Sequence, residues 1–229
     1  MKIGKIITFL GAQASGKSTL VKQVEEALPD TTAFYEGEHF PDYVEEAFQN
    51  PDKRIRAFLY FHNLWLDQYH QAEHIRQEGK IALLDTFWFT NYFYLDTLPY
   101  PIEQEIIKGL MKTVSSILPP PDLMFHLDMD EEEMISRIKS RGRYWEVEPD
   151  WLAEPLGVKK RHEAFLENEK EKNLYFPEVP IHRLDAKDSY QKNEVIKILN
   201  LQGKLLQNLF STMPLNCNSL SNRVIFERI

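Results

Sequence analysis

The chain has 229 residues, of which 43% are hydrophobic, and its formal net charge at pH 7 is −8. That size and composition predict one substantial α/β core and exclude a disordered or fibrous chain. The acidic balance argues against a general nucleic-acid surface, because phosphate backbones attract clustered Lys and Arg.

Five apolar runs of strand length alternate with longer helical patterns. The predicted strands are residues 5–10, 32–36, 80–85, 122–128 and 180–185. Strands that alternate with helices indicate a mainly parallel sheet covered on both faces. We therefore predict an α/β protein, a three-layer α/β/α fold around a five-stranded, mainly parallel sheet.

The predicted helices lie between these strands, at residues 18–28, 53–78, 101–118, 130–141, 158–173 and 189–209. Residues 53–78 carry an apolar stripe at helical spacing. The third helix must end before the "PPP" that follows it, because consecutive prolines cannot continue a helix. The acidic run that opens 130–141 suits the positive end of a helix dipole.

The last stretch, residues 205–229, is rich in Ser and Asn and lacks periodicity, so we predict a weakly attached tail after one domain spanning residues 1–204. The chain's single cysteine, Cys217, excludes an intramolecular disulfide and fits a reducing compartment. No segment approaches the roughly 20 apolar residues of a membrane span, and the first residues do not form a signal peptide. We expect a cytoplasmic protein with no membrane or nucleic-acid partner.

The segment "GAQASGKS", residues 11–18, matches G-x-x-x-x-G-K-[ST] between a predicted strand and a predicted helix. In that context it predicts a P-loop NTPase fold, although a glycine-rich turn that binds nothing is the alternative. Lys17 would place positive charge on the β and γ phosphates, and the Ser18 hydroxyl would bind Mg²⁺. The predicted ligand is ATP with Mg²⁺, held by Gly11, Ala12, Ala14, Ser15, Gly16, Lys17, Ser18 and Thr19.

A second basic site lies in the middle of this acidic chain. On a helix, Arg137 and Arg141 share a face, and Gly142 would release Arg143 into the following loop. A solvated charged face is the plain alternative. Mobile guanidinium groups can neutralise a transferring phosphoryl group and exclude water. We therefore predict a hinged lid at about residues 137–150, with the three arginines in catalytic roles.

Three carboxylates lie at or just beyond predicted strand ends: Glu36, Glu38 and Asp85. In open α/β sheets, ligands bind beyond the carboxyl ends of the strands. We predict that Glu36 is the general base for the acceptor hydroxyl and that Asp85 acts with Ser18 on the metal side. An acid that merely ends a strand is the alternative, above all for Glu38.

Aromatic residues crowd the same regions, and most of them are expected in the core. A flat base or heterocycle could nevertheless stack among two or three of them. We predict Phe61 and His62 as contacts to the acceptor, with His62 at the edge of the base, against the alternative of a structural histidine.

Four segments in the same order resemble the deoxynucleoside kinases, relatives of thymidylate kinase among the P-loop kinases. They are "GAQASGKST", "FYEGEHF", "AFLYFHN" with the later "LLDTFWF", and "RIKSRGRYWE"; the resemblance spans about residues 3–185. It implies transfer of the γ-phosphate of ATP to the 5′-hydroxyl of a (deoxy)nucleoside, with Glu36 as the catalytic acid residue. It also implies that Glu146 contacts the sugar 3′-hydroxyl, and family members are commonly homodimers.

Two positions depart from that family. His62 replaces its base-reading glutamine, and Thr86 follows Asp85 where the family usually has arginine. A missing cation suits a neutral nucleoside better than a monophosphate. The segment "IALLDTFWFTN" also resembles nicotinamide riboside kinases, whereas the lid and the helix after it favour deoxynucleosides. We therefore rank a nucleoside acceptor first, a nucleoside monophosphate second and nicotinamide riboside third. A P-loop ATPase and a nucleotide-binding module are the alternatives from other classes.

Overall fold

The computed structural model describes residues 4–37, 39–142, 149–187 and 191–200. The chain divides into two compact units, residues 1–192 and 193–229, and the site described below belongs to the first. The predicted domain boundary at residue 204 and the predicted tail, 205–229, lie outside the described residues. Of the predicted helix 189–209, residues 191–200 are described and are helical.

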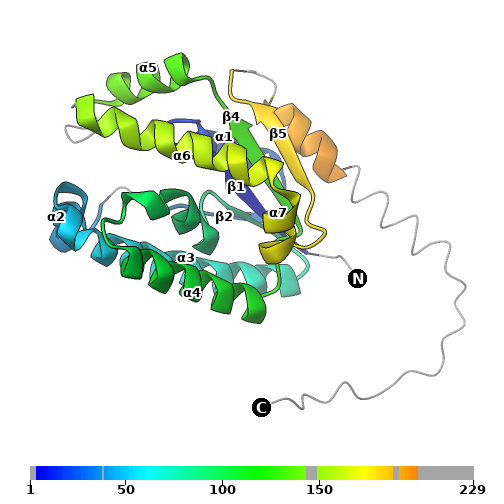
Figure 1. Ribbon diagram of the computed structural model, residues 1–229. Coiled ribbons are helices and arrows are strands. Elements are labelled where there is room, and N and C mark those ends of the chain that lie inside the picture. The colour runs from blue at the N-terminus through cyan, green and yellow to red at the C-terminus, as the bar shows by residue number, and fades with distance from the viewer. Residues whose placement is uncertain (1–3, 38, 143–148, 188–190, 201–229) are drawn as a thin grey trace, which may run out of the picture. The chain divides into compact units, whose positions relative to one another are not determined.

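Five strands form one sheet in the order β2-β3-β1-β4-β5 (Figure 1). The strands are β1 Lys5–Leu10, β2 Thr31–Phe34, β3 Ile81–Leu84, β4 Leu123–Asp128 and β5 Ile181–Asp185. Every pair of neighbouring strands is parallel; Ile7 of β1, for example, is in register with Leu83 of β3 and Leu123 of β4. The five predicted strands and the predicted parallel sheet are therefore confirmed.

The helices of the first unit are α1 Lys17–Ala27, α2 Asp42–Gln49, α3 Arg54–Gln77, α4 Pro101–Ile117, α5 Glu131–Arg141, α6 Pro149–Glu167 and α7 Glu169–Tyr175, with the 3₁₀ segments η1 Pro51–Lys53 and η2 Trp88–Thr97. The first four predicted helices correspond to α1, α3, α4 and α5. The sequence did not reveal α2 and η2. Among the described residues, no helix has the length and apolar character needed to cross a bilayer.

The predicted single helix 158–173 is wrong in its start and in its continuity. Helix α6 begins nine residues earlier, at Pro149, and contains Pro155, whose presence in a helix interior is normally unfavourable. Asn168 then interrupts the helical run, because its side-chain oxygen accepts a hydrogen bond from the Glu171 backbone N–H at 3.1 Å and starts α7. The single predicted helix is therefore two helices.

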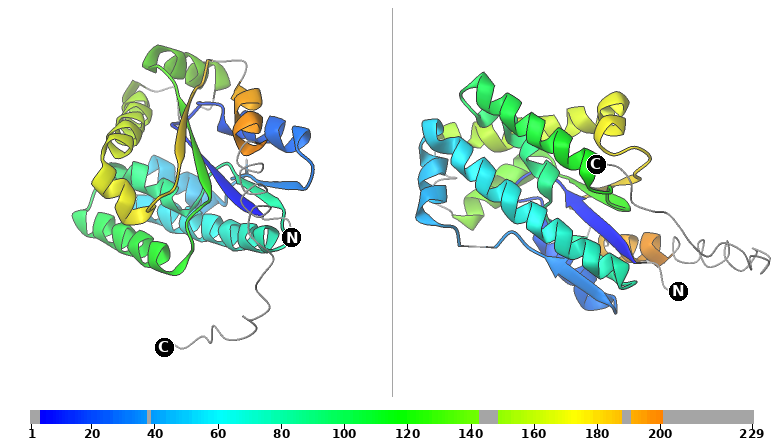
Figure 2. Two further views of the ribbon diagram at one scale, coloured as in Figure 1. Left: turned by 90° about the vertical axis from the view of Figure 1, so that its right-hand side faces the viewer. Right: turned by 90° about the horizontal axis from the view of Figure 1, so that it is seen from below.

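The two faces of the sheet are covered by different helices (Figure 2). On one face, Ile6 and Leu10 of β1 share a core cluster with buried residues of α3, α4, α6 and η2. Helix α1 lies on the other face and packs against β1, β2 and β3. Alternating side chains along each strand feed both cores, which gives three layers.

This topology places the carboxyl ends of β2, β3 and β1 next to one another. The loop after β1 carries residues 11–16, the segment after β2 carries Glu36, and the segment after β3 begins with Asp85 and Thr86. Segments that are 20 to 75 residues apart in the chain therefore meet at one edge of the sheet.

Candidate active site

The loop between β1 and α1 adopts a backbone that needs glycine at two positions. Gly11 has φ +148°, and a Cβ there would lie 2.8 Å from Ser15 Oγ and 2.9 Å from the Leu127 carbonyl oxygen. Gly16, at the start of α1, has φ +91°, in the left-handed region. Backbone N–H groups in such a loop, together with the N-terminus of the helix, form a concave site for anions.

Lys17 lies across this loop. Its Nζ donates hydrogen bonds to the carbonyl oxygens of Gly11 at 2.8 Å and Ala12 at 3.1 Å, which uses two of its three donors. Burial lowers the pKa of Lys17, and the nearby carboxylates of Asp85 and Glu36 oppose that shift. The geometry therefore places one ammonium group beside an anion-binding loop and two carboxylates.

Ser18 and Asp85 form a pair at the same end of the cavity. The Ser18 hydroxyl donates to Asp85 Oδ2 at 2.6 Å. Asp85 is only 4% exposed, and its Oδ1 has no hydrogen-bond partner among the described residues. A hydroxyl and an unsatisfied carboxylate fit Mg²⁺, which prefers oxygen ligands and is commonly held by one or two protein groups together with substrate phosphates. In the described part of the chain, no three or more His, Cys, Asp or Glu side chains form a group that could hold a metal ion by themselves.

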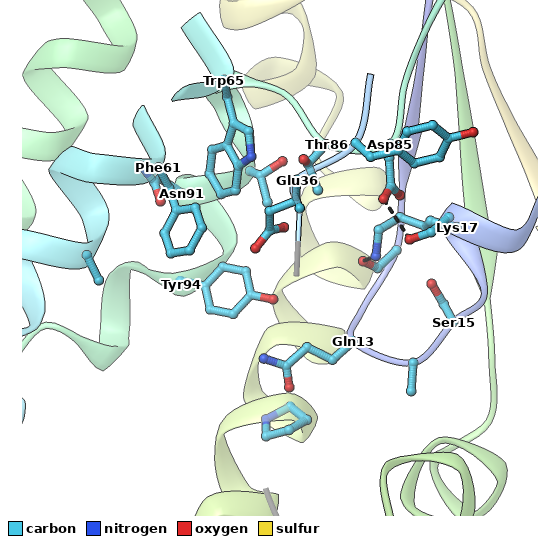
Figure 3. A pocket seen from close by; sticks show the side chains of 18 of the residues that line it. Gln13, Ser15, Lys17, Glu36, Phe61, Trp65, Asp85, Thr86, Asn91 and Tyr94 are labelled. Atoms are coloured by element: carbon cyan, nitrogen blue, oxygen red, sulfur yellow. Dashed lines mark hydrogen bonds between the residues drawn. The ribbon is translucent and has the colours of Figure 1, made fainter. Parts of the chain in front are cut away.

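One cavity of about 650 Å³ joins these groups to an aromatic wall. We call the part lined by Gly11, Gly16, Lys17, Ser18 and Asp85 the phosphate end, and the part lined by Phe40, Phe48, Phe61 and Trp65 the aromatic end. The rings of the aromatic end pack in series, with Phe61 stacked on Trp65 at 5.2 Å and on Phe48 at 6.0 Å between centroids. Figure 3 shows the two ends on opposite sides of the cavity.

Between the two ends lie Glu36, Tyr94 and Gln13 (Figure 3). Gln13 lies near the Tyr94 hydroxyl (Figure 3). Burial raises the pKa of Tyr94, and the carboxylates of Glu36 and Glu154 raise it further, so the phenol stays neutral. Glu36 therefore stands within reach of both ends, next to a neutral hydroxyl.

The arginines of α5 approach the phosphate end. Helix α5 ends at Arg141, and Gly142 follows with φ +66°. Arg137 lies beside the loop, because a Cβ built at Gly16 would be 3.7 Å from Arg137 Nη1. Arg137 Nε also donates to Glu133 Oε1 at 2.7 Å. Arg141 lines the cavity, and its charge contributes to the lowered pKa of Lys17.

The remaining predicted site residues have mixed placements. Ala14, Ser15 and Thr19 line the phosphate end, whereas the contribution of Ala12 is the carbonyl group that accepts from Lys17. The predicted roles of Arg143 and Glu146 lie outside the described residues, as do those of Glu38 and of lid residues 143–148.

His62 is not among the residues that line the cavity, and its predicted contact with the acceptor stays a prediction. The α3 residues that line it are Arg54, Ala57, Phe58, Phe61 and Trp65. His62 is 4% exposed, and burial lowers its pKa.

Sequence reasoning missed several polar residues that line the cavity, above all Arg54, Asn91, Tyr94 and Glu154. Asn91 and Tyr94 belong to η2, whose only sequence signal is a run of aromatic residues after the third strand. Arg54 and Glu154 pair across 100 residues of sequence, at 2.9 Å between Nη1 and Oε2. A single sequence carries no signal for such a pair.

The wholly parallel sheet, the anion loop after β1 and the Ser18–Asp85 pair define a P-loop nucleotide-binding protein. A family model described as AAA domain matches residues 6–150, more than half of the chain.

Among curated proteins, the chain is 28% identical over 204 residues to the probable thymidylate kinase 1 of Saccharolobus solfataricus, covering 84% of this chain and 93% of that protein. It is 30% identical over 157 residues to the probable thymidylate kinase of Methanosarcina barkeri, covering 61% of this chain and 72% of that protein. A solved structure of deoxyadenosine kinase from M. mycoides with bound dATP shares the fold, with a TM-score of 0.66, 20% identity, and coverage of 86% of this chain and 99% of that one. The chain therefore belongs to the AAA domain family of P-loop proteins, and its relatives show that it is a nucleoside or nucleotide kinase.

Proposed function

We propose that this kinase transfers the γ-phosphoryl group of ATP to the 5′-hydroxyl of a nucleoside. The observation that carries the proposal is the single cavity in which Glu36 lies between an anion-binding phosphate end and an aromatic end. A phosphotransferase needs this arrangement, because donor and acceptor must be held in line with a proton acceptor beside the attacking hydroxyl.

The residues have distinct roles in that reaction. The acceptor oxygen bonds to the γ-phosphorus, the bond from phosphorus to the bridging oxygen of ADP breaks, and Glu36 accepts the proton of the hydroxyl. Lys17 and the arginines of α5, Arg137 and Arg141, stabilise the negative charge on the transferring group. Ser18 and Asp85 would hold Mg²⁺, which when bound supplies further neutralisation of the phosphate oxygens.

The acceptor proposal is supported by the chemistry of the aromatic end. Stacked rings of Phe61 and Trp65 offer a flat apolar surface of the kind on which a heterocyclic base stacks. Thr86 lines the same cavity, is 6% exposed and has an Oγ1 without a hydrogen-bond partner among the described residues. A hydroxyl at this position suits a neutral acceptor, whereas a monophosphate would favour a cation there.

A nucleoside monophosphate is the second candidate acceptor, because the two curated relatives described above are named as probable thymidylate kinases. That candidate requires recognition of an extra dianion near Thr86. The two candidates are separable, because they differ in the charge of the acceptor rather than in the donor.

The test is ADP release from ATP and Mg²⁺, measured with a panel of nucleosides, their 5′-monophosphates and nicotinamide riboside. Release that depends on a nucleoside supports the proposal. Release only with a monophosphate replaces it by the second candidate. Release without any acceptor indicates an ATPase, and no release with measurable ATP binding indicates a binding module.

A further inference from the structure

The structure assigns a specificity-determining residue that the proposed function leaves open: Glu154, held in place by Arg54, reads the base of the acceptor. This inference rests on the proposed nucleoside acceptor. It names the chemistry of the preferred base, one that presents an amino group beside the carboxylate, as adenine, cytosine and guanine do.

The pair is built into the wall of the cavity. Arg54 lies in the first turn of α3 and Glu154 in α6, and both side chains line the cavity that contains the aromatic end. Arg54 Nη2 donates to the Phe48 carbonyl at 3.1 Å, and its Nη1 donates to Glu154 Oε2 at 2.9 Å. Phe48 belongs to the stacked rings of the aromatic end. The guanidinium group is therefore fixed by the same segment that supplies the aromatic wall.

Glu154 keeps acceptor capacity after pairing with Arg54. Its side chain is 20% exposed, and Arg54 is its hydrogen-bond partner among the described residues, through Oε2. A carboxylate has about four lone-pair sites, so Oε1 can accept from a molecule in the cavity. The carboxylate lines the same cavity as Tyr94 and contributes to the raised pKa of that phenol.

Acceptor-only chemistry gives the selectivity. A carboxylate accepts an N–H hydrogen bond from an exocyclic amino group, and such charge-assisted bonds are among the stronger ones. Thymine and uracil carry their ring N–H between two carbonyl groups, so a carbonyl oxygen would approach the carboxylate and leave it unpaired. A site built around a buried polar group rejects a ligand that cannot pair with it more strongly than an apolar site does.

The plain alternative is that the pair only fastens α6 to α3. The substitution Glu154→Gln separates the two roles, because glutamine has nearly the same shape and still accepts from Arg54 but also offers an N–H₂ donor. Glu46→Gln is the matched control: Glu46 also pairs with cations near the start of α3, Lys53 and Arg56, but it is half exposed and outside the cavity.

The experiment measures kcat/KM with ATP for cytidine and adenosine against uridine and thymidine, in the deoxy and ribo series, for wild type and both variants. Equilibrium binding of the same nucleosides is measured in parallel. We expect Glu154→Gln to lower the preference for amino bases by about 10- to 100-fold, and Glu46→Gln to leave it unchanged. Melting temperatures of all three proteins check that each is folded.

An equal loss for all four bases, or an unchanged ratio in both measurements, would overturn the inference and leave the pair a structural one. A wild-type preference for thymidine or uridine would also overturn it. If the proposed function fails, the result is different, because no nucleoside then stimulates ADP release. The equilibrium binding of the four nucleosides to wild type and Glu154→Gln would in that case still decide the role of Glu154.

Discussion

The two ends of the cavity are built in different ways. The phosphate end comes mainly from one continuous loop, residues 11–18, whose backbone forms the anion site and whose neighbour Asp85 follows the adjacent strand. The aromatic end comes from α2, the segment just before it and α3, and polar residues that complete the cavity come from α3, η2 and α6. The comparison teaches that the phosphate end is mainly a local property of the chain, whereas the aromatic end and its polar neighbours are assembled from distant segments. The variants of Lys17, Glu36 and Phe61 described below test that division.

The largest expected effect is at the phosphate end. Lys17→Ala removes the ammonium group beside the anion loop, and we expect turnover to fall by about 10³-fold or more, because the transition state carries extra charge there. The turnover is measured as nucleoside-dependent release of ADP. Lys22→Ala, an exposed lysine on the same helix, is the control. Near-normal activity of Lys17→Ala would remove this residue from the mechanism.

Between the two ends, Glu36→Gln should lower kcat by about 10²- to 10⁴-fold while ATP affinity stays close to that of wild type, because the amide cannot accept the proton. Steady-state kinetics and nucleotide binding give the two quantities. Glu105→Gln, an exposed residue on α4, should have no effect. If the rate of Glu36→Gln matches wild type, another group is the base.

Next to the strand that leads into the phosphate loop, we expect His126 to make the stability of the fold sensitive to acid. This residue of β4 is 3% exposed and in register with Leu10, the last residue of β1. Burial lowers its pKa to about 4. Between that value and the ordinary pKa of about 6.5, the unfolded chain binds the proton and the folded chain does not, so stability falls as pH decreases through this window. From pH 6.5 to pH 5 the loss is about 2 kcal/mol for this residue.

His126→Leu should therefore reduce the loss of unfolding free energy between pH 7 and pH 5 by about 2 kcal/mol, measured by urea denaturation at several pH values. His74→Leu, at an exposed histidine, is the control. Identical pH profiles for wild type and His126→Leu would contradict the assignment.

The smallest expected effect is at the aromatic end. Phe61→Leu keeps an apolar side chain but removes the ring stacked on Trp65, so we expect the KM for the nucleoside to rise about 10-fold with little change in the KM for ATP. Leu59→Ala, on the exposed side of the same helix, is the matched control. An equal rise for ATP and nucleoside would mean that the two ends are not separate subsites.

Sequence patterns predicted the five strands, four of the helices and the phosphate loop, because each depends on residues that are close in the chain. Hydrophobic runs specify strands, and a motif of eight residues specifies an anion loop wherever it joins a strand to a helix. Prediction failed where a single side chain competes with the backbone, as Asn168 does between α6 and α7.

Sequence alone thus determined the loop after the first strand, since backbone conformation at Gly11 and Gly16 is a local matter. Only the tertiary structure decided the aromatic end and the polar residues around it. It placed Phe61, and not His62, in the lining of the cavity, and it joined Arg54 to Glu154. The physical reason is that side-chain direction and long-range pairing depend on how helices pack, which no local pattern specifies.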